Sequence, residues 1–227
     1  MNPKQLAGER AVDYVEDGMI LGLGTGSTAF YAIRRLGQRV RDGLKVSGIA
    51  TSEQSRAQAQ EEGIPLVTFE QVTTVDLTID GADEVDPAFN LTKGGGGALL
   101  REKIVALASA VEIIVIDPSK LKPHLGAFPL PVEVVPFASF HTGRQLEALG
   151  CSATLRRTGT DAFVTDNGNF IYDCSFGSII APAQLESDVE SICGVVACGL
   201  FVDLTNRIIV GLDDGTVQEL DEPQPLA

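Results

Sequence analysis

Three short segments contain residue types and spacings that could perform chemistry on a small polar molecule. Residues 22–29 read GLGTGSTA, residues 80–86 read DGADEVD, and residues 93–102 read KGGGGALLRE. Their glycines let a ligand approach the backbone, and their hydroxyl, carboxylate and ammonium groups can bind an anion, move protons or stabilise negative charge on oxygen. We therefore expect a site that binds a phosphate or a sugar and transfers protons.

The GLGTGSTA segment has the features of a phosphate-binding loop. Small residues between a predicted strand and a predicted helix expose successive N–H groups, and the helix N-terminus adds partial positive charge. Thr25, Ser27 and Thr28 supply hydroxyl donors around Gly26. The segment is not a Walker A loop, and it departs from the dinucleotide motif G-x-G-x-x-G at the third glycine, where Thr28 or Ala29 stands. A tight turn with a Ser/Thr helix cap explains the pattern equally well.

The DGADEVD segment places two carboxylates close together directly after a predicted strand. Asp80 and Asp83 flank the small residues Gly81 and Ala82, so both carboxylates can turn toward one point. Paired carboxylates can accept hydrogen bonds from sugar hydroxyls or move their protons. The alternative is an ordinary turn in which an aspartate caps the next segment.

The KGGGG run combines a cation with four consecutive glycines. Lys93 can stabilise negative charge that develops on a substrate oxygen. Gly94, Gly95 and Gly96 permit positive φ and let their N–H groups approach a ligand, whereas side chains there would block that approach. The alternative is a flexible loop, but such a loop needs neither a lysine at its head nor a helix directly behind it.

Glu102 lies one turn into the helix predicted over residues 99–109. The apolar residues Leu100, Ile104 and Leu107 form one stripe of that helix, and Glu102 lies on the opposite side. A carboxylate next to the lysine and glycine segment could act as a general base. The alternative is a solvated helix face, because a basic residue flanks Glu102 on each side.

Strands that alternate with helices in the first half of the chain predict parallel βαβ units with right-handed crossovers. We expect helices over residues 4–16, from the GTGST segment to about 40, over 52–62 and over 99–109, and strands over 19–23, 44–50, 75–79 and 112–116. Ligand groups in such sheets gather at the carboxyl ends of the strands, so the three segments should act together. Lys120 follows the last of these strands and either reaches the same edge or is an exposed turn lysine.

The pattern changes near residue 128, where FPLPVEVVPF places three prolines in ten residues around a strand-like VEVV. Proline at strand edges suits a crossover between domains. We expect the ferredoxin-like order β-α-β-β-α-β after it. The expected elements are helices over 138–149 and 182–191, strands over 162–165, 170–174 and 195–202, and a hairpin turn at Asn167-Gly168.

The sequence therefore predicts an α/β fold with two domains. A main domain with a parallel sheet would comprise residues 1–128 plus 203–227, because we expect the tail to return to it. A smaller ferredoxin-like α+β domain would comprise residues 129–202.

Composition narrows the partners and the location. The formal charge of −14 and the pI of about 4.5 disfavour nucleic acid, and no basic stripe offsets them. No apolar run reaches the ~18 residues that a spanning helix needs, and the N-terminus lacks a secretory pattern, so we expect a cytoplasmic protein with no membrane partner. Cys151, Cys174, Cys193 and Cys198 form no C-x-x-C pair, so we expect free thiols rather than a metal site.

The three segments, in this order and spacing, resemble ribose-5-phosphate isomerase of the A type. The resemblance extends through DPSK, FPLPVEVVP, VTDNGN and GVVACGLF and covers nearly the whole chain. It implies interconversion of D-ribose 5-phosphate and D-ribulose 5-phosphate, without a metal or organic cofactor. It also implies a Rossmann-like main domain and a smaller domain that takes part in oligomer contacts, in a homodimer or homotetramer. The pentose phosphate pathway and Calvin-type carbon fixation both use this reaction. Ala197-Cys198 depart from the family, many of whose members carry Glu-His there.

The resemblance also implies roles for individual residues. Glu102 falls on the family's catalytic base, and Asp80, Asp83 and Lys93 fall on residues for substrate binding and proton handling. The residues that fall on substrate- and phosphate-binding segments are Thr25, Gly26, Ser27, Thr28, Gly81, Ala82, Gly94, Gly95, Gly96 and Lys120.

The implied chemistry passes through an enediolate. Glu102 would remove the C2 proton and return it to C1, while Lys93 and glycine N–H groups stabilise the oxygen charge. Asp80 and Asp83 would assist ring opening and proton movement between O1 and O2. The sequence does not assign either role to one particular aspartate.

Two other readings are a sugar-phosphate sensor and a CoA-transferase-like enzyme. The sensor would need a DNA-binding segment, and the acidic chain has no spare basic helix-turn-helix. The transferase would use its glutamate as a nucleophile that acyl-CoA labels covalently.

Overall fold

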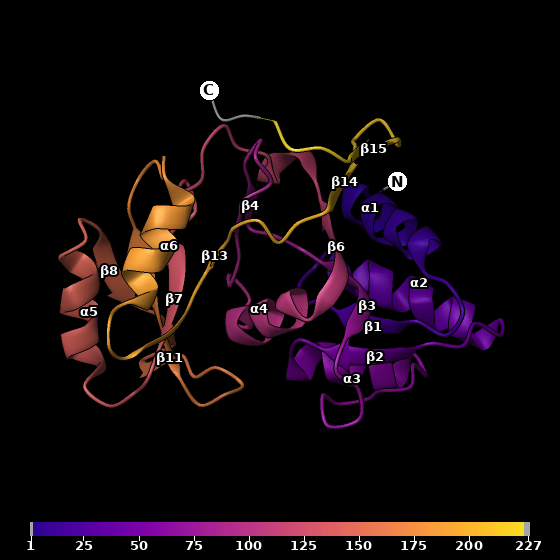
Figure 1. Cartoon of the computed structure of the whole chain (residues 1–227), viewed down its shortest axis with the longest axis horizontal. Helices are drawn as coiled ribbons and strands as arrows, with labels where there is room; N and C mark the ends of the chain where they lie inside the picture. Colours follow the sequence, from indigo (N-terminus) through magenta and orange to yellow (C-terminus); the bar gives the residue numbers. More distant parts are fainter. Residues whose placement is uncertain (1, 225–227) are drawn as a thin grey trace. The chain divides into compact units, whose positions relative to one another are not determined.

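The computed structural model describes residues 2–224, and Figure 1 shows them coloured along the chain. These residues form two compact units. The first unit contains residues 2–82, 101–120 and 204–223, and the second contains residues 83–100, 121–203 and 224. The domain boundaries proposed from the sequence stay a prediction, and the compact units differ from them mainly by placing residues 83–100 and 121–128 in the second unit.

A six-stranded sheet forms the centre of the first unit, in the order β15-β14-β6-β3-β1-β2. Its strands are β1 (Ile20–Leu23), β2 (Ser47–Ala50), β3 (Val75–Asp80), β6 (Ser109–Ile116), β14 (Arg207–Gly211) and β15 (Val217–Leu220). Neighbouring strands pair in parallel, except that β15 pairs antiparallel with β14. Apolar runs such as EIIVI in β6 suit strands that are covered on both faces. The expected Rossmann-like, mainly parallel sheet is confirmed, and β14 and β15 return to it as expected.

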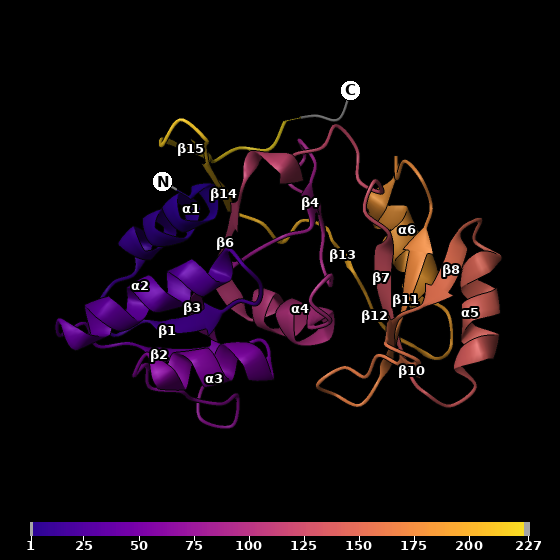
Figure 2. The same ribbon diagram turned by 180° about the vertical axis from the view of Figure 1, so that it is seen from behind.

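Helices cover both faces of this sheet (Figure 2). They are α1 (Pro3–Ala11), α2 (Ala29–Arg41), α3 (Glu53–Glu61) and α4 (Leu99–Leu107), with 3-10 turns at Val12–Tyr14 and Pro118–Lys120. Leu21 and Leu23 of β1 pack into one apolar cluster with residues of α1 and α2. A side chain at Gly22 would meet Val105 of α4, so α4 covers the opposite face, as the alternation along a strand requires.

The strand order reverses between β1 and β3. From β1 the chain adds β2 on one side, and from β3 it adds β6 and then β14 on the other. Ligands of open α/β sheets bind at such a switch point, beyond the carboxyl ends of the strands. The GLGTGSTA loop follows β1 and Asp80 ends β3, so two of the predicted segments lie at this point.

The second unit contains a four-stranded antiparallel sheet in the order β12-β7-β11-β8. Its elements are β7 (Leu130–Val134), α5 (Ser139–Glu147), β8 (Ser152–Leu155), β11 (Phe170–Ser175), α6 (Pro182–Glu190) and β12 (Val195–Cys198). Along the chain this is β-α-β-β-α-β, and Leu130, Val132 and Val134 of β7 pack with Leu146 of α5 and Val189 of α6. The ferredoxin-like fold expected for this part is confirmed.

Two smaller sheets complete the second unit. They consist of β4 (Glu84–Val85), β5 (Leu91–Thr92) and β13 (Leu200–Phe201) in one sheet, and β9 (Arg157–Thr158) and β10 (Asp161–Ala162) in the other. β5 lies between β13 and β4, and both of its neighbours are antiparallel to it. Asp83 directly precedes β4 and Lys93 directly follows β5, so this small sheet brings two predicted catalytic residues to one end.

The prediction of a strand over residues 162–165 is wrong. The second strand of the ferredoxin-like sheet is β8, and β10 ends at Ala162. The expected turn does form, since Gly168 has φ +81° and its N–H donates to the Thr165 carbonyl. Beside the turn, the Thr165 hydroxyl donates to the fully buried Glu133 carboxylate at 2.9 Å.

Two other boundaries differ from the expectation. α1 ends at Ala11 rather than near residue 16, because the next three residues tighten into a 3-10 turn and Val15 is extended. β6 starts at Ser109 instead of residue 112, which shortens α4 to end at Leu107. Boundaries of this kind depend on tertiary packing more than on local propensity.

Candidate functional site in two parts

The loop between β1 and α2 exposes part of its backbone and buries part of its side chains. Gly26 is exposed with φ +116°, a conformation that a residue with a Cβ rarely adopts. Ser27 is exposed as well, whereas Thr28 is buried at the start of α2. The loop therefore exposes Gly26 and the Ser27 hydroxyl near a helix N-terminus, which suits an anion.

The Thr25 hydroxyl belongs to a buried hydroxyl cluster, which we define as Thr25, Thr51, Ser52 and Ser55. Its Oγ1 lies 2.8 Å from the hydroxyls of Thr51 and Ser52 and 3.1 Å from that of Ser55. The Ser55 hydroxyl donates to the Gly24 carbonyl at 2.6 Å. The cluster thus fixes the loop to the N-terminus of α3, and the Thr25 hydroxyl serves the loop's support in this structure.

Asp80 is held by backbone N–H groups at the switch point. Its Oδ1 accepts hydrogen bonds from the Thr25 N–H at 3.0 Å and from the Gly81 N–H at 2.7 Å, and Asp80 is 1% exposed. A Cβ at Gly24 would lie 2.3 Å from the Asp80 carboxylate, so only glycine fits there. The two predicted segments of the first unit are therefore joined directly.

Two lysines lie near the same loop. Lys4 of α1 donates to the Ser27 hydroxyl at 2.9 Å, and its Nζ lies 4.0 Å from Asp117. Burial raises the pKa of Asp117, but hydrogen bonds from Ser119 and the positive charges of Lys4 and Lys120 outweigh it and lower the pKa. The positive charge of Lys120 thus acts on Asp117, directly after β6. Lys4 was missed by the sequence analysis, because nothing local distinguishes it from any lysine of an amphipathic helix.

Glu102 is buried in the first turn of α4. It is 5% exposed, so the alternative of a solvated helix face is wrong. The stripe expected to pack is instead exposed, with Ile104 at 47% and Leu107 at 66%, while Leu99 and Val105 are buried. Only the packing of α4 decides which of its faces is covered, and it covers the face that carries the carboxylate.

The residue before Glu102 anchors the helix within the first unit. Arg101 donates to the Glu53 carboxylate of α3 at 2.8 Å. The hydrogen bond from Arg101 lowers the pKa of Glu53. This ion pair links the first turn of α4 to α3, the helix to which the hydroxyl cluster fixes the loop after β1.

In the second unit, Asp83 and the glycine run contact each other. The Gly95 N–H donates to Asp83 Oδ2 at 2.7 Å, and a Cβ at Gly95 would lie 2.5 Å from Asp83 Oδ1. Gly94 has φ +104°, which also favours glycine. The run is therefore a fixed loop that carries a carboxylate, which answers the alternative of mere flexibility.

Lys93 and Arg156 are set around the same loop of the second unit. Lys93 is 2% exposed, its N–H donates to the Gly199 carbonyl, and its Nζ lies 5.5 Å from the centre of the Phe201 ring. Arg156 donates to the Gly94 carbonyl at 2.8 Å while it also pairs with Asp173. Sequence analysis missed Arg156, because its partner lies 62 residues away along the chain.

The predicted site residues thus fall into two groups, one in each compact unit. The first unit joins Thr25 to Asp80, and Ser27 to Lys4, and buries Glu102. The second unit joins Asp83 to Gly95 and buries Lys93. Gly96 is exposed in the same run, and Ala82, which belongs to the first unit, is half-buried. Ala197 and Cys198 are buried, at 2% and 0% exposure.

Within residues 2–224, no group of three or more histidine, cysteine, aspartate or glutamate side chains is placed to hold a metal ion. Across the same residues, no helix combines the length and apolar character that crossing a bilayer requires.

Fold and site together define an α/β protein with a glycine- and hydroxyl-rich loop at the switch point of a mainly parallel sheet, where ligands of such sheets bind. The sequence model of a family described as ribose 5-phosphate isomerase A (phosphoriboisomerase A) matches residues 47–215. The chain belongs to this family.

Individual relatives agree with this assignment. A ribose-5-phosphate isomerase A from Gloeobacter violaceus is 53% identical over 219 residues, which cover 96% of this chain and 95% of the relative. One from Bacillus mycoides is 47% identical over 216 residues, covering 95% and 98%.

Solved structures show the same fold over nearly the whole chain. Ribose 5-phosphate isomerase A from Methanocaldococcus jannaschii superposes with a TM-score of 0.91 at 41% identity, covering 96% of this chain and 98% of that one. A D-ribose-5-phosphate isomerase in complex with phospho-erythronic acid superposes with a TM-score of 0.94 at 39% identity, covering 98% and 100%.

Proposed function

We propose that this chain interconverts D-ribose 5-phosphate and D-ribulose 5-phosphate through an enediolate, with Glu102 as general base and acid. Membership of the ribose 5-phosphate isomerase A family is the observation that carries the reaction. The relative solved with phospho-erythronic acid supports a phosphorylated sugar derivative as the ligand class. The carboxylate of such an acid is planar and anionic, as an enediolate is.

The burial of Glu102 supports its role as the base. Isomerisation removes a proton from C2 of the open-chain aldose and delivers one to C1 of the ketose, so one carboxylate can accept the proton and return it. A carboxylate shielded from water is a stronger base than an exposed one, because burial disfavours its charged form. Arg101 and Lys103, the two basic neighbours of Glu102, are both partly exposed, so Glu102 is the shielded charged residue of that turn.

Asp80, Asp83 and Lys93 are proposed to handle the substrate oxygens. Asp80 is fixed by two N–H groups and Asp83 by one, so each carboxylate has a defined orientation. Lys93 supplies positive charge for the oxygen that becomes negative in the enediolate. We leave the two aspartates jointly responsible for ring opening and for proton movement between O1 and O2.

The phosphate is proposed to bind at the start of α2. Ser27, Thr28 and the Gly26 N–H provide donors, and Lys4 and Lys120 provide charge in an otherwise acidic protein. Binding the phosphate away from the reacting carbons orients them without stabilising the ground state at the reacting bond. We also retain, as proposals, a role in the pentose phosphate pathway, a cytoplasmic location and a dimer or tetramer.

The proposal is tested by measuring conversion of ribose 5-phosphate to ribulose 5-phosphate with EDTA present. Wild type should turn over, and Glu102→Gln should lose at least ~10²-fold in kcat, the lower range for a general base. Lys103→Gln is the matched control on the same helix and should stay near wild type.

Each possible outcome of that assay tests a different assumption of the proposal. A silent wild type that still binds ribose 5-phosphate would make the chain a sensor. Equal rates for wild type and Glu102→Gln would keep the isomerase but remove Glu102 as its base. Covalent labelling of Glu102 by acyl-CoA would favour the transferase reading.

A further inference from the structure

Arg156 holds the carbonyl side of the glycine run in the second unit. It lies between β8 and β9, and its Nη1 donates to the Gly94 carbonyl at 2.8 Å and to the Gly95 carbonyl at 3.3 Å. Its Nε donates to Asp173 Oδ2 at 3.0 Å, and its Nη2 donates to Asp173 Oδ1. A planar guanidinium can bind a carboxylate with two donors and still offer others. Arg156 therefore joins the run to β11, the strand that carries Asp173.

A single peptide group connects Arg156 to Asp83. The Gly94 carbonyl and the Gly95 N–H belong to one planar trans group, so they point in opposite directions. Arg156 holds the carbonyl, while the Gly95 N–H donates to Asp83 Oδ2 at 2.7 Å. Hydrogen bonds in such a chain polarise one another, so the charged donor at the carbonyl strengthens the N–H at the other end. The orientation of the Asp83 carboxylate therefore depends on Arg156.

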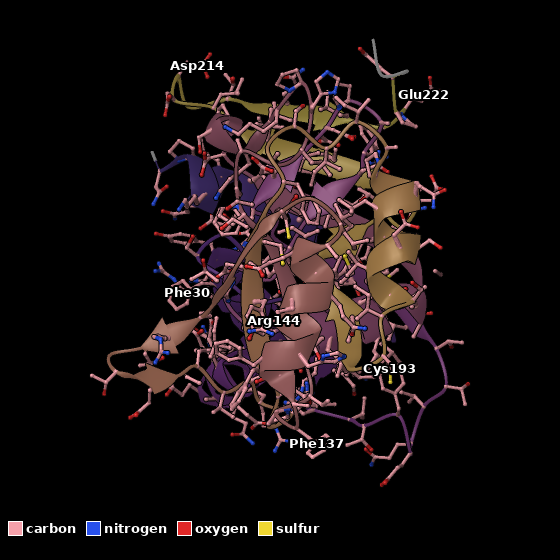
Figure 3. The ribbon with its side chains drawn as sticks, turned by 90° about the vertical axis from the view of Figure 1, so that its left-hand side faces the viewer. Phe30, Phe137, Arg144, Cys193, Asp214 and Glu222 are labelled. Atoms are coloured by element: carbon pink, nitrogen blue, oxygen red, sulfur yellow. The ribbon has the colours of Figure 1, made fainter. Side chains whose placement is uncertain are left out.

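The glycine run depends on its neighbours for a fixed shape, because it has no side chains of its own to pack. Its far end is covered by Phe163, since a Cβ at Gly97 would lie 2.5 Å from the Phe163 ring. The Phe163 N–H donates to the Arg156 carbonyl at 2.9 Å, and the ring centre lies 5.7 Å from the guanidinium carbon. Between these two residues the chain forms the short antiparallel hairpin of β9 and β10 (Figure 3). Arg156 and Phe163 thus contact the run at its two ends.

We propose that Arg156, oriented by Asp173, is a positioning residue for the isomerisation: it fixes the peptide group that presents Asp83 to the substrate oxygens. The inference rests on the proposed function, in which Asp83 handles those oxygens. Through the Gly95 carbonyl, Arg156 also orients the next peptide group, which carries the Gly96 N–H. A purely structural arginine would stabilise the fold without changing the rate of the folded enzyme, and this difference can be measured.

The test compares kcat and KM for ribose 5-phosphate among full-length variants. Arg156→Ala should lower kcat about 10²-fold, because small displacements of catalytic groups cost up to that much. KM should change less, since the proposed phosphate loop belongs to the first unit. Arg156→Lys should remain close to Arg156→Ala, because an ammonium group lacks the planar fork that reaches a carboxylate and two carbonyls together.

Arg157→Ala is the matched control. Arg157 is exposed, and its Nη1 donates to the Thr160 carbonyl at 2.7 Å within the hairpin of β9 and β10. The variant removes the same charge one position further along the chain and should keep the kcat of wild type. If Arg156→Ala fails to fold, Asp173→Asn is the second variant, and it should lower kcat about tenfold because the guanidinium loses its charged partner.

Two readouts separate positioning from a purely structural role. Guanidinium ions, added below denaturing concentrations, should restore kcat of Arg156→Ala by about tenfold or more in a saturable way, whereas methylammonium ions should not. In protein labelled with isotope-enriched glycine, the Gly95 amide signal should move and its hydrogen exchange should accelerate in Arg156→Ala. Guanidinium should reverse both changes, because it refills the site beside the Gly94 carbonyl.

The outcomes distinguish this inference from the proposed function. An active wild type with an unchanged kcat in Arg156→Ala overturns the positioning role alone, and so does a loss of kcat that guanidinium does not restore while the Gly95 amide stays unmoved. A wild type that does not convert ribose 5-phosphate overturns the proposed function, and the Gly95 amide then still shows whether Arg156 fixes the peptide group that holds Asp83.

Discussion

Replacing Thr51 by valine should loosen the phosphate loop without leaving a cavity. Thr51 is fully buried, and its Oγ1 donates to the Leu23 carbonyl at 3.0 Å and lies 2.8 Å from Thr25 Oγ1. Valine has nearly the same shape, so the change removes two hydrogen bonds worth about 1 kcal/mol each and should lower the free energy of unfolding by about 2 kcal/mol. For a chain of this size the melting temperature should fall by about 4–8 °C.

The same substitution should slow the reaction, because the Thr25 N–H that it loosens also holds Asp80. We expect kcat for ribose 5-phosphate to fall about tenfold, since small misplacements of catalytic groups cost one to two orders of magnitude. Differential scanning calorimetry and a ribulose 5-phosphate assay measure the two effects. Thr74→Val, at an exposed position, is the control and should change neither.

Either of two results would refute this reasoning. An unchanged melting temperature would mean that the hydroxyl cluster does not stabilise the loop. A lower melting temperature with an unchanged kcat would mean that the cluster stabilises the fold but does not position Asp80. A double-mutant cycle with Ser55→Ala should show a coupling of more than about 0.5 kcal/mol, because the two hydroxyls share the Thr25 oxygen.

Three further outcomes are expected. Gly95→Ala should abolish activity and lower the melting temperature, because its Cβ would lie 2.5 Å from Asp83; a circular dichroism melt and the isomerase assay check both. Lys4→Ala should raise KM about tenfold or more with a smaller effect on kcat, because the substrate loses one charged hydrogen bond. An unchanged KM would exclude Lys4 from the phosphate site. The hydrogen bond from Tyr14 is the main cause that lowers the pKa of Glu219. The ionised carboxylate therefore stabilises the fold above its unfolded pKa near 4.5, and this stabilisation is lost as the pH falls through the lower folded pKa. The free energy of unfolding in urea should differ between wild type and Glu219→Gln at pH 7 and converge in acid.

The sequence by itself determined the architecture and the segments that carry the chemistry. Alternating strands and helices predicted the parallel sheet, and the β-α-β-β-α-β order predicted the ferredoxin-like part, because both patterns depend on residues that are neighbours in the chain. The GLGTGSTA and KGGGG segments were recognisable because glycine at such positions leaves a local signature. In the structure, glycine N–H groups hold both carboxylates, since Gly81 donates to Asp80 and Gly95 donates to Asp83.

Tertiary structure decided the features that depend on distant partners. Apolar spacing chose the wrong face of α4, since Ile104 is exposed and Glu102 is buried, and periodicity cannot say which side of a helix meets the sheet. The Thr25 hydroxyl points inward because Thr51, Ser52 and Ser55 offer it three hydroxyls, although they follow Thr25 by 26 to 30 positions in the chain. Lys4 reached Ser27 across 23 residues. Contacts between residues far apart in the chain leave no local pattern, so only the folded chain could reveal them.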